Sequence, residues 1–456
     1  MTITDIRGHA LSGANADAAL AYSDAIRQFS VYAGDPVGAA ESLIAAGPGF
    51  VMAHALKAWL YLLGTAPAAL PVARAAIAAA EALPGTAQER GHLAALRHLA
   101  AGQWHLASRV IEDVALENPR DLLALIAGHQ IDYFTGNGRM LKDRIARALP
   151  AWSKTTPGHH SMLGMHAFGL EENGLYGQAE RQGRAALAAE AGDGWARHAV
   201  AHVLEMQGRH DDGIAFMRED LASWTTDSFL AVHNWWHLAL YHLELGQIDE
   251  VLELVDGPIT SVAAPQMMDL IDASAMLWRL HLRGVDVGQR WQLLARQYEA
   301  GWSAGGYAFN DFHAMMAFVG AGRRDLAEQT LETQSIALLA ASDNADFTQQ
   351  VGYPLMQALK AFGEGRYGDA VRLIRPVRAI AARFGGSNAQ RDIIDLTLIE
   401  AALRAGERSL AKALAAERVM AKHDSPLAKL FARRAGLSSC GDQAGCDGLT
   451  CGIAAA

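Results

Sequence analysis

Cysteine is nearly absent from this chain of 456 residues, which has three, all within the last seventeen positions, at Cys440, Cys446 and Cys451. The rest of the chain therefore cannot depend on disulfides, which is typical of a reducing compartment. Five and four residues separate successive cysteines, unlike the close pairs of zinc sites. We interpret residues 438–456, which are rich in Gly and Ala, as a disordered tail.

Long apolar runs are also missing. The richest apolar stretch, residues 53–82, is interrupted by Lys57, Pro67 and Arg74 before it reaches the roughly 20 residues that span a bilayer. The first residues, MTITDIRGHALSGANADAAL, lack the positively charged start and apolar segment of a secretory signal. We therefore expect a cytoplasmic protein without a membrane partner.

The chain has fewer positively charged than negatively charged residues. The chain has 39 Lys and Arg against 49 Asp and Glu, a net charge of −10. This balance gives no basic footprint for a phosphate backbone, so we expect no nucleic acid partner. The sequence also lacks an HExxH motif, a glycine-rich phosphate loop and a recognisable nucleophile motif.

What the sequence does have is a glycine that recurs every 34 or 38 residues. Each of these glycines follows an apolar helical pattern and precedes a second one, which predicts a repeated helix-turn-helix unit. An earlier unit at Gly34 and two wider-spaced ones at Gly365 and Gly406 bring the total to about eleven helical pairs. The regularly spaced glycines are Gly64, Gly102, Gly136, Gly174, Gly208, Gly246, Gly284 and Gly322.

A single helical pair cannot bury its own apolar face, so neighbouring pairs must stack into a solenoid with a concave inner surface. We expect an all-α fold, a right-handed superhelix with an enclosed concave face. Residues 1–19 form an N-terminal segment in this interpretation. Residues 20–437 form one solenoid domain, because the repeat continues without a break.

Three further features accompany the glycines. An aromatic residue follows two positions later at Trp104 and Tyr176, alanine follows five positions later at Ala107 and Ala179, and proline ends many units. The pattern resembles the tetratricopeptide repeat. More specifically, four segments resemble those of the tetratricopeptide repeat protein 38 family: HAVAHVLEMQGR (198–209), HNWWHLALYHLELG (233–246), FNDFHAMMAFVGAGR (309–323) and FGGSNAQRDIIDLTLIEAALRAG (384–406). This resemblance implies the fold and a pocket, and it assigns no reaction.

Histidines occupy the positions expected to face the concave side. In tetratricopeptide repeats the first helix of each pair lines that side, and counting back from Gly208 gives His198, His202 and Glu205. Spacings of four and three residues place their side chains on one helix face. The next unit adds His233 and His237, and because packed helices lie roughly 8–10 Å apart, we expect the two pairs to converge.

Clustered histidines suit acid–base chemistry or metal binding, because an imidazole titrates near neutral pH and offers a nitrogen ligand. We expect His198, His202, His233 and His237 to be catalytic. His198, His202 and Glu205 could bind a divalent ion such as zinc, iron or manganese. Glu205 and Asp311 would orient the rings.

Other polar residues could complete a pocket, some from the preceding unit and others from across the superhelix. A structural role is equally compatible with histidines that share the inward position in earlier units, such as His54 and His92. The expected substrate contacts are His160, His166, Trp236, Asn310, His313, Gln390, Arg391 and Asp392.

Two functions fit this pattern. The first is an enzyme, a hydrolase or lyase, that uses acid–base or metal-assisted chemistry on a compact polar substrate. The second is a scaffold that holds an extended peptide in the groove, as many such repeats do. Peptide grooves usually present Lys, Arg and Asn, whereas the inward positions here are His, Trp and Glu, which favours the enzyme.

Overall fold

The computed structural model describes residues 3–437, which form helices and no strand apart from two isolated bridges, Thr4–Ala10 and Ala33–Ser228. The tail predicted over residues 438–456, with its three cysteines, lies outside the described residues. The helices to the middle of the chain are α1 (Ala16–Val31), α2 (Pro36–Ala46), α3 (Val51–Leu63), η1 (Pro67–Ala69), α4 (Leu70–Glu81), α5 (Ala87–Ala100), α6 (Trp104–Glu117), α7 (Leu122–Phe134), α8 (Gly138–Ala148), η2 (Leu149–Ala151), α9 (His159–Glu171), α10 (Tyr176–Ala189), α11 (Gly194–Met206), α12 (His210–Arg218) and α13 (Leu221–Thr225). The remaining helices are α14 (Ala231–Leu245), α15 (Ile248–Leu254), η3 (Val255–Ile259), α16 (Met267–Leu282), α17 (Arg290–Gly301), α18 (Ala308–Gly320), α19 (Arg324–Ala337), α20 (Asp343–Phe347), η4 (Thr348–Gly352), α21 (Tyr353–Gly363), α22 (Tyr367–Val377), η5 (Arg378–Phe384), α23 (Asn388–Arg404), α24 (Arg408–Ala421) and α25 (Pro426–Arg434).

The predicted all-α solenoid of helical hairpins is confirmed. Within residues 3–437, eleven hairpins follow one another from α1–α2 to α23–α24, with α25 at the end. The repeat glycines end the first helix of each hairpin in the left-handed region, for example at φ 69° for Gly208, where glycine lacks the steric cost of a side chain. Gly64 is the exception, because Thr65 takes the positive φ there.

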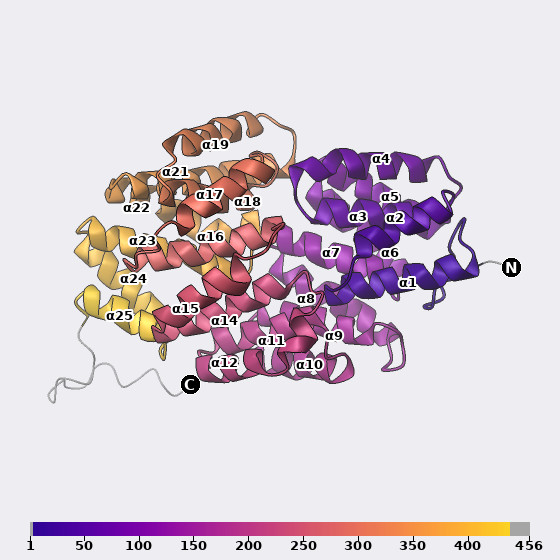
Figure 1. Ribbon diagram of the computed structural model, residues 1–456, viewed down its shortest axis with the longest axis horizontal. Coiled ribbons are helices and arrows are strands. Elements are labelled where there is room, and N and C mark those ends of the chain that lie inside the picture. Colours follow the sequence, from indigo (N-terminus) through magenta and orange to yellow (C-terminus); the bar gives the residue numbers. More distant parts are fainter. Residues whose placement is uncertain (1–2, 438–456) are drawn as a thin grey trace.

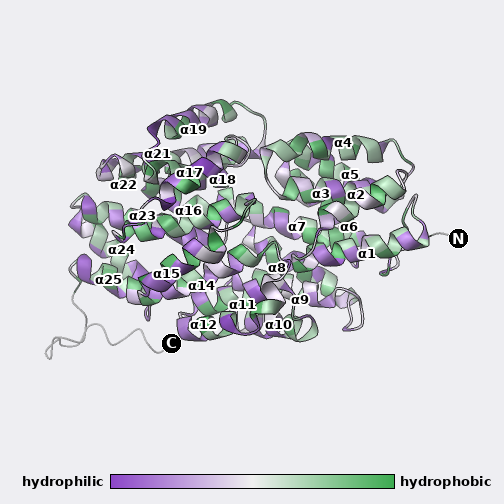
Figure 2. Cartoon of the chain, in the orientation of Figure 1, coloured by the Kyte–Doolittle hydropathy of each residue, from purple (hydrophilic) through white to green (hydrophobic). Residues whose placement is uncertain are grey.

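Helix packing explains the small residue five positions after most of the repeat glycines. Ala107 and Ala179 are completely buried, and a Cβ at Gly213 would lie 2.5 Å from the ring of Tyr241. Gly213 belongs to α12 and Tyr241 to α14 of the next hairpin, so α12 approaches α14 this closely only with a small residue at this position. Figure 2 shows apolar and polar residues interspersed along the helices.

The array turns back on itself, so that early and late hairpins touch (Figure 1). Asn310 of α18 donates to Thr65 after α3 at 3.1 Å, and the Tyr307 hydroxyl donates to the carbonyl of Phe134 in α7 at 2.9 Å. The backbone N–H of Asp343 bonds the carbonyl of Gly102 at 2.9 Å. These contacts close the concave face into an interior space, as expected from the length of the array.

The N-terminal segment is shorter than predicted, since α1 begins at Ala16, capped by the side chain of Asn15. None of the described helices is long and apolar enough to cross a membrane. The cytoplasmic location stays a prediction.

Candidate functional site

The closed concave face holds a cavity of about 300 Å³, at the lower end of the range for ligand pockets. Side chains from first helices of hairpins in both halves of the chain line it, and aromatic residues dominate. The aromatic lining residues are Phe29, Tyr32, Tyr133, Phe134, Trp195, Phe229, Tyr307 and Phe309, and the aliphatic ones include Leu60, Leu63, Met267, Met268 and Ile271.

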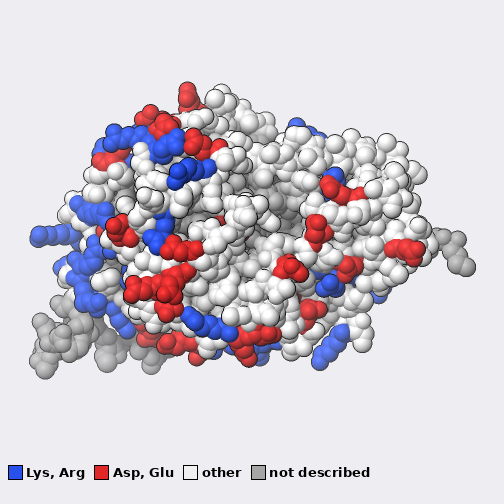
Figure 3. Space-filling view, in the orientation of Figure 1, with Lys and Arg blue, Asp and Glu red and all other residues white. Residues whose placement is uncertain are grey.

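The cavity wall carries little charge. Among residues 3–437, Asp35 is the one acidic residue that lines the cavity, and no Lys or Arg does. Asp35 caps α2 by accepting from Gly38 N–H at 2.8 Å. In the space-filling view the middle of this face is hollowed and mostly uncharged around the hollow (Figure 3). The compact polar substrate expected from the sequence does not fit this lining, which suits a largely apolar molecule.

Four histidines meet beside the cavity. His198 and His202 come from α11, and His233 and His237 come from α14. The Nε2 atoms of His198 and His233 are 3.0 Å apart, and the ring centroids of His202 and His237 are 4.5 Å apart. All four side chains are buried. We call this group the histidine cluster.

The local sequence explains why two helices can deliver four rings. Each helix carries its two histidines four residues apart, hence on one face. Asp193 caps the start of α11 by accepting from Ala196 N–H at 2.9 Å, which fixes where that face begins. Helix α11 packs directly against α14, so their inward faces share one volume.

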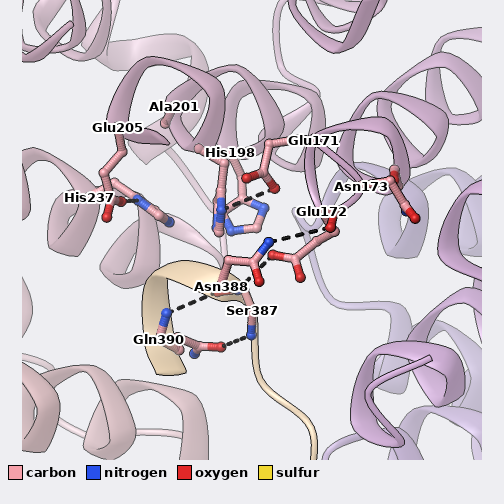
Figure 4. A network of polar contacts seen from close by, with 12 residues as sticks. Glu171, Glu172, Asn173, His198, Ala201, Glu205, His237, Ser387, Asn388 and Gln390 are labelled. Carbon is pink, nitrogen blue, oxygen red and sulfur yellow. Dashed lines mark hydrogen bonds and ion pairs between the residues drawn. The ribbon is translucent and has the colours of Figure 1, made fainter. Parts of the chain in front are cut away.

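Carboxylates stand behind three of the four rings. Asp272 of α16 lies 2.9 Å from Nδ1 of His233. Glu171, the last residue of α9, lies 3.4 Å from Nδ1 of His202, and Glu205 lies 3.4 Å from Nδ1 of His237. Figure 4 shows Glu205 next to His237, with Glu171 on the other side of His198. At His233 this contact is a hydrogen bond, whereas Glu171 and Glu205 lie beside their rings without forming one. A carboxylate beside Nδ1 is the usual support of a metal-binding histidine.

Burial sets the charge state of the cluster. It lowers the pKa of His202 to about 4 and lowers the pKa of His198 and His237 well below the ordinary value, with repulsion from neighbouring histidines adding to the effect. Burial also raises the pKa of Glu171 well above its ordinary value, and the nearby Glu205 raises it further. The rings of His198, His202 and His237 are therefore neutral at neutral pH and able to act as ligands.

The geometry suits one metal ion. One ring nitrogen from each of the four histidines can be chosen so that all lie within 4.8 Å of one another, and nitrogens around one tetrahedral zinc ion lie about 3.4 Å apart. Both ring nitrogens of His202 and of His237 lack a hydrogen-bond partner. Glu205 does not belong to this group and stands behind His237, so it is placed as an orienting residue and not as a ligand.

Asp311 does not orient the cluster, and that expectation is wrong. Its carboxyl accepts from the N–H of Gly305 at 3.0 Å and from the side chain of Gln334 on α19. These bonds tie the start of α18 to its own loop and partner helix. Burial raises the pKa of Asp311 to about 8.

Several expected substrate contacts have structural partners instead. His160 bonds Asp193, the cap of α11, at 2.8 Å, and His166 bonds Gln182 of its own hairpin at 2.7 Å. His313 bonds the carbonyl of Phe309 in its own helix at 2.8 Å. None of these three lines the cavity.

Three more expected contacts also lie away from the cavity. Trp236 is completely buried, stacked on His233 and covered by the guanidinium of Arg279. Arg391 bonds Asn388 at 2.8 Å, and Asp392 pairs with Arg418 at 2.8 Å.

Of the predicted site residues, four line the cavity: His198, His233, Asn310 and Gln390. Sequence reasoning missed Glu171 and Asp272. Glu171 stands three residues before Gly174, as Glu205 stands three before Gly208, so a comparison of equivalent positions could have found it. No such regularity marks Asp272.

No protein-family model matches the chain. Among solved structures, the chain is similar to the human IFIT1 dimer with m7Gppp-AAAA, at 14% identity and a TM-score of 0.42, covering 91% of this chain and 93% of that one. It is also similar to a chain of Naa15/Naa10 bound to HypK-THB, at 11% identity and a TM-score of 0.25, covering 87% and 68%. At such identities the likeness concerns the arrangement of helices alone.

The exclusion of nucleic acid partners is corrected by this comparison, because the similar IFIT1 structure holds a capped RNA. Net charge describes a whole chain and not a local surface. Here residues 360–437 hold fifteen Lys and Arg against eight Asp and Glu, an excess of seven cations in a chain of net charge −10. Part of that excess is visible beside α24 and α25 in Figure 3.

Proposed function

We propose that the histidine cluster binds one divalent transition-metal ion, and that the protein uses this ion to act on a small, uncharged and largely apolar molecule held in the cavity. The observation that carries the proposal is the convergence of four buried imidazoles, three of which have a carboxyl group beside Nδ1. Purely structural histidines normally bond to carbonyls or to single polar partners. This arrangement is the one that metal ligands need.

The donor set narrows the choice of ion. Imidazole nitrogen suits zinc, iron, copper and nickel, whereas manganese prefers carboxylate and water oxygen. Of the three ions expected from the sequence, zinc and iron therefore fit best. A divalent charge among the rings would also favour the ionised form of the buried carboxyls behind them.

The proposed reaction is hydrolysis or elimination, in which the ion acts as a Lewis acid or activates water. The cavity lining favours an uncharged substrate, because its polar side chains largely form hydrogen bonds with one another. Gln130 donates to the hydroxyl of Tyr32 at 2.8 Å, and the hydroxyl of Tyr133 donates to Gln390. Such a wall offers apolar contact more than ionic recognition.

The resemblance to the tetratricopeptide repeat protein 38 family is also retained as a proposal. It rests on the four segments quoted above. No step of the proposed chemistry depends on it.

Elemental analysis tests whether the histidine cluster binds a metal ion. Tag-free protein is dialysed against zinc and then against buffer before the measurement. We expect about one ion per chain in the wild type and in His166→Ala, a matched change of a histidine that bonds Gln182 outside the cavity. His202→Ala should lose the ion. Metal-free wild-type protein, or a His202→Ala variant that keeps the ion, would overturn the proposal.

The fluorescence of N-phenyl-1-naphthylamine, a neutral apolar probe, tests whether the cavity binds an apolar molecule. We expect bright, saturable binding that Met268→Trp abolishes by filling the cavity. Leu293→Trp places the same side chain at an exposed site and should leave binding unchanged. Equal binding by both variants would show that the probe does not occupy the cavity.

A further inference from the structure

The four rings of the histidine cluster are not held equally. His202, His233 and His237 each have a carboxylate within 3.4 Å of Nδ1. Nδ1 of His198 is buried and has no hydrogen-bond partner. Its neighbours are aromatic, with ring centroids 4.6 Å away at Trp195 and 5.3 Å away at Phe168. Its one polar contact is through Nε2, to Nε2 of His233 at 3.0 Å. His198 is therefore the one ring of the cluster with no carboxylate beside its Nδ1.

His198 also stands between the cluster and the cavity. Among the four histidines, only His198 and His233 line the cavity wall. His233 is fixed by both oxygens of Asp272 at 2.9 Å. A molecule in the cavity can therefore reach the centre of the cluster most easily by moving the imidazole of His198.

We propose that His198 is an exchangeable fourth ligand. It occupies the coordination position facing the cavity until a donor atom of the substrate takes its place. This inference rests on the proposed metal site. Catalytic zinc sites keep three protein ligands and leave the fourth position to water or substrate, and His202, His233 and His237, each with its carboxylate, form such a set.

The expected ligand follows from the same geometry. It has an apolar body that contacts the aromatic wall and an uncharged nitrogen or oxygen donor at one end. The side chain of His198 is itself a donor of this kind, packed between Trp195 and Phe168. Free imidazole is therefore a suitable probe for the position that His198 would vacate.

Cobalt(II) titration, followed by visible absorption, tests the inference in the wild type and in His198→Ala and His233→Ala, which truncate the two cavity-lining rings. His198→Ala should bind Co²⁺ within about tenfold of the wild type, while His233→Ala should lose at least 100-fold. Added imidazole should then shift the spectrum of His198→Ala at concentrations that leave the wild type unchanged. His198→Gln serves as a second variant if the alanine variant fails to fold.

The outcomes separate the two proposals. Wild-type protein that binds no Co²⁺ removes the metal site and this inference with it. Wild-type protein that binds Co²⁺, with equal losses in His198→Ala and His233→Ala, leaves the metal site standing and shows that His198 is an ordinary ligand. Co²⁺ binding by His198→Ala with no response to imidazole also overturns exchange at this position.

Discussion

Buried histidines have different hydrogen-bond partners in two regions of the solenoid. In the first half, His92 accepts from Trp59 Nε1 at 3.1 Å on one nitrogen and lies 2.8 Å from Asp121 on the other. Asp121 caps α7, so His92 braces the start of the next hairpin. In the histidine cluster, by contrast, rings from two helices face one another and leave nitrogens without partners.

The difference teaches how to distinguish a structural histidine from a candidate ligand. His92 is completely buried, and so are His202 and His237. Burial alone therefore does not separate them. What differs is whether the protein itself satisfies both nitrogens, because an unsatisfied buried polar group is costly unless something else binds it.

The largest expected effect tests this difference between His92 and the histidine cluster directly. His237→Ala should abolish metal binding, because it removes one of the three ligands that have a carboxyl group beside Nδ1. His92→Ala should leave the metal content at the wild-type level, since that ring lies in a different hairpin. Elemental analysis of the two purified variants checks both, and equal metal loss would mean that the distinction based on satisfied nitrogens fails.

A second pair of variants compares the carboxylates behind the rings. Asp272→Asn should weaken metal affinity by about 10–100-fold, because it removes the charge that orients His233. Asp121→Asn changes the equivalent carboxylate behind His92 and should leave affinity unchanged. Competition with a chelating dye measures both dissociation constants, and an unaltered affinity in Asp272→Asn would show that this carboxylate does not support a ligand.

A third prediction concerns stability alone. His92→Phe keeps a ring of similar shape but leaves Trp59 and Asp121 without their partner, which should cost about 1–3 kcal/mol of unfolding free energy. Urea unfolding of the metal-free variant and wild type measures this cost. A loss much below that range would mean that His92 contributes little to the bracing of α7.

The sequence predicted the fold well because the repeat is local. Glycine turns and small residues at close contacts are fixed by neighbouring helices, as at Gly208 and Gly213. Helical spacing likewise predicted that His198 and His202 share one helix face, and that His233 and His237 share another. That four rings would meet depended only on adjacent hairpins, which always pack together.

Contacts across the superhelix were much harder to predict. Asp311 was expected to reach the cluster, yet its carboxyl turns to Gly305 and Gln334. Asp272, in the next hairpin, supports His233 without any regular spacing to reveal it. Which side chains meet across a closed interior depends on curvature summed over many repeats, and no single segment encodes that sum.

The last prediction concerns Asp311, a buried carboxyl group that lies outside the histidine cluster. Burial raises the pKa of Asp311 to about 8, whereas an unfolded Asp titrates near 3.9. Between these values the folded state keeps a proton that the unfolded state releases, so the wild type loses stability as the pH rises from about 4 toward 8. Asp311→Asn cannot ionise and lacks this loss.

The stability difference between Asp311→Asn and the wild type should therefore shift in favour of the variant with rising pH, by at most about 1.4 kcal/mol per pH unit. Urea unfolding at pH 5, 6, 7 and 8 measures the slope. Metal content should stay at the wild-type level, because Asp311 contacts the α17–α18 loop and α19 instead of a histidine of the cluster. A parallel pH dependence in the two proteins would show that Asp311 is ionised in the folded state, and a loss of metal would return it to the site.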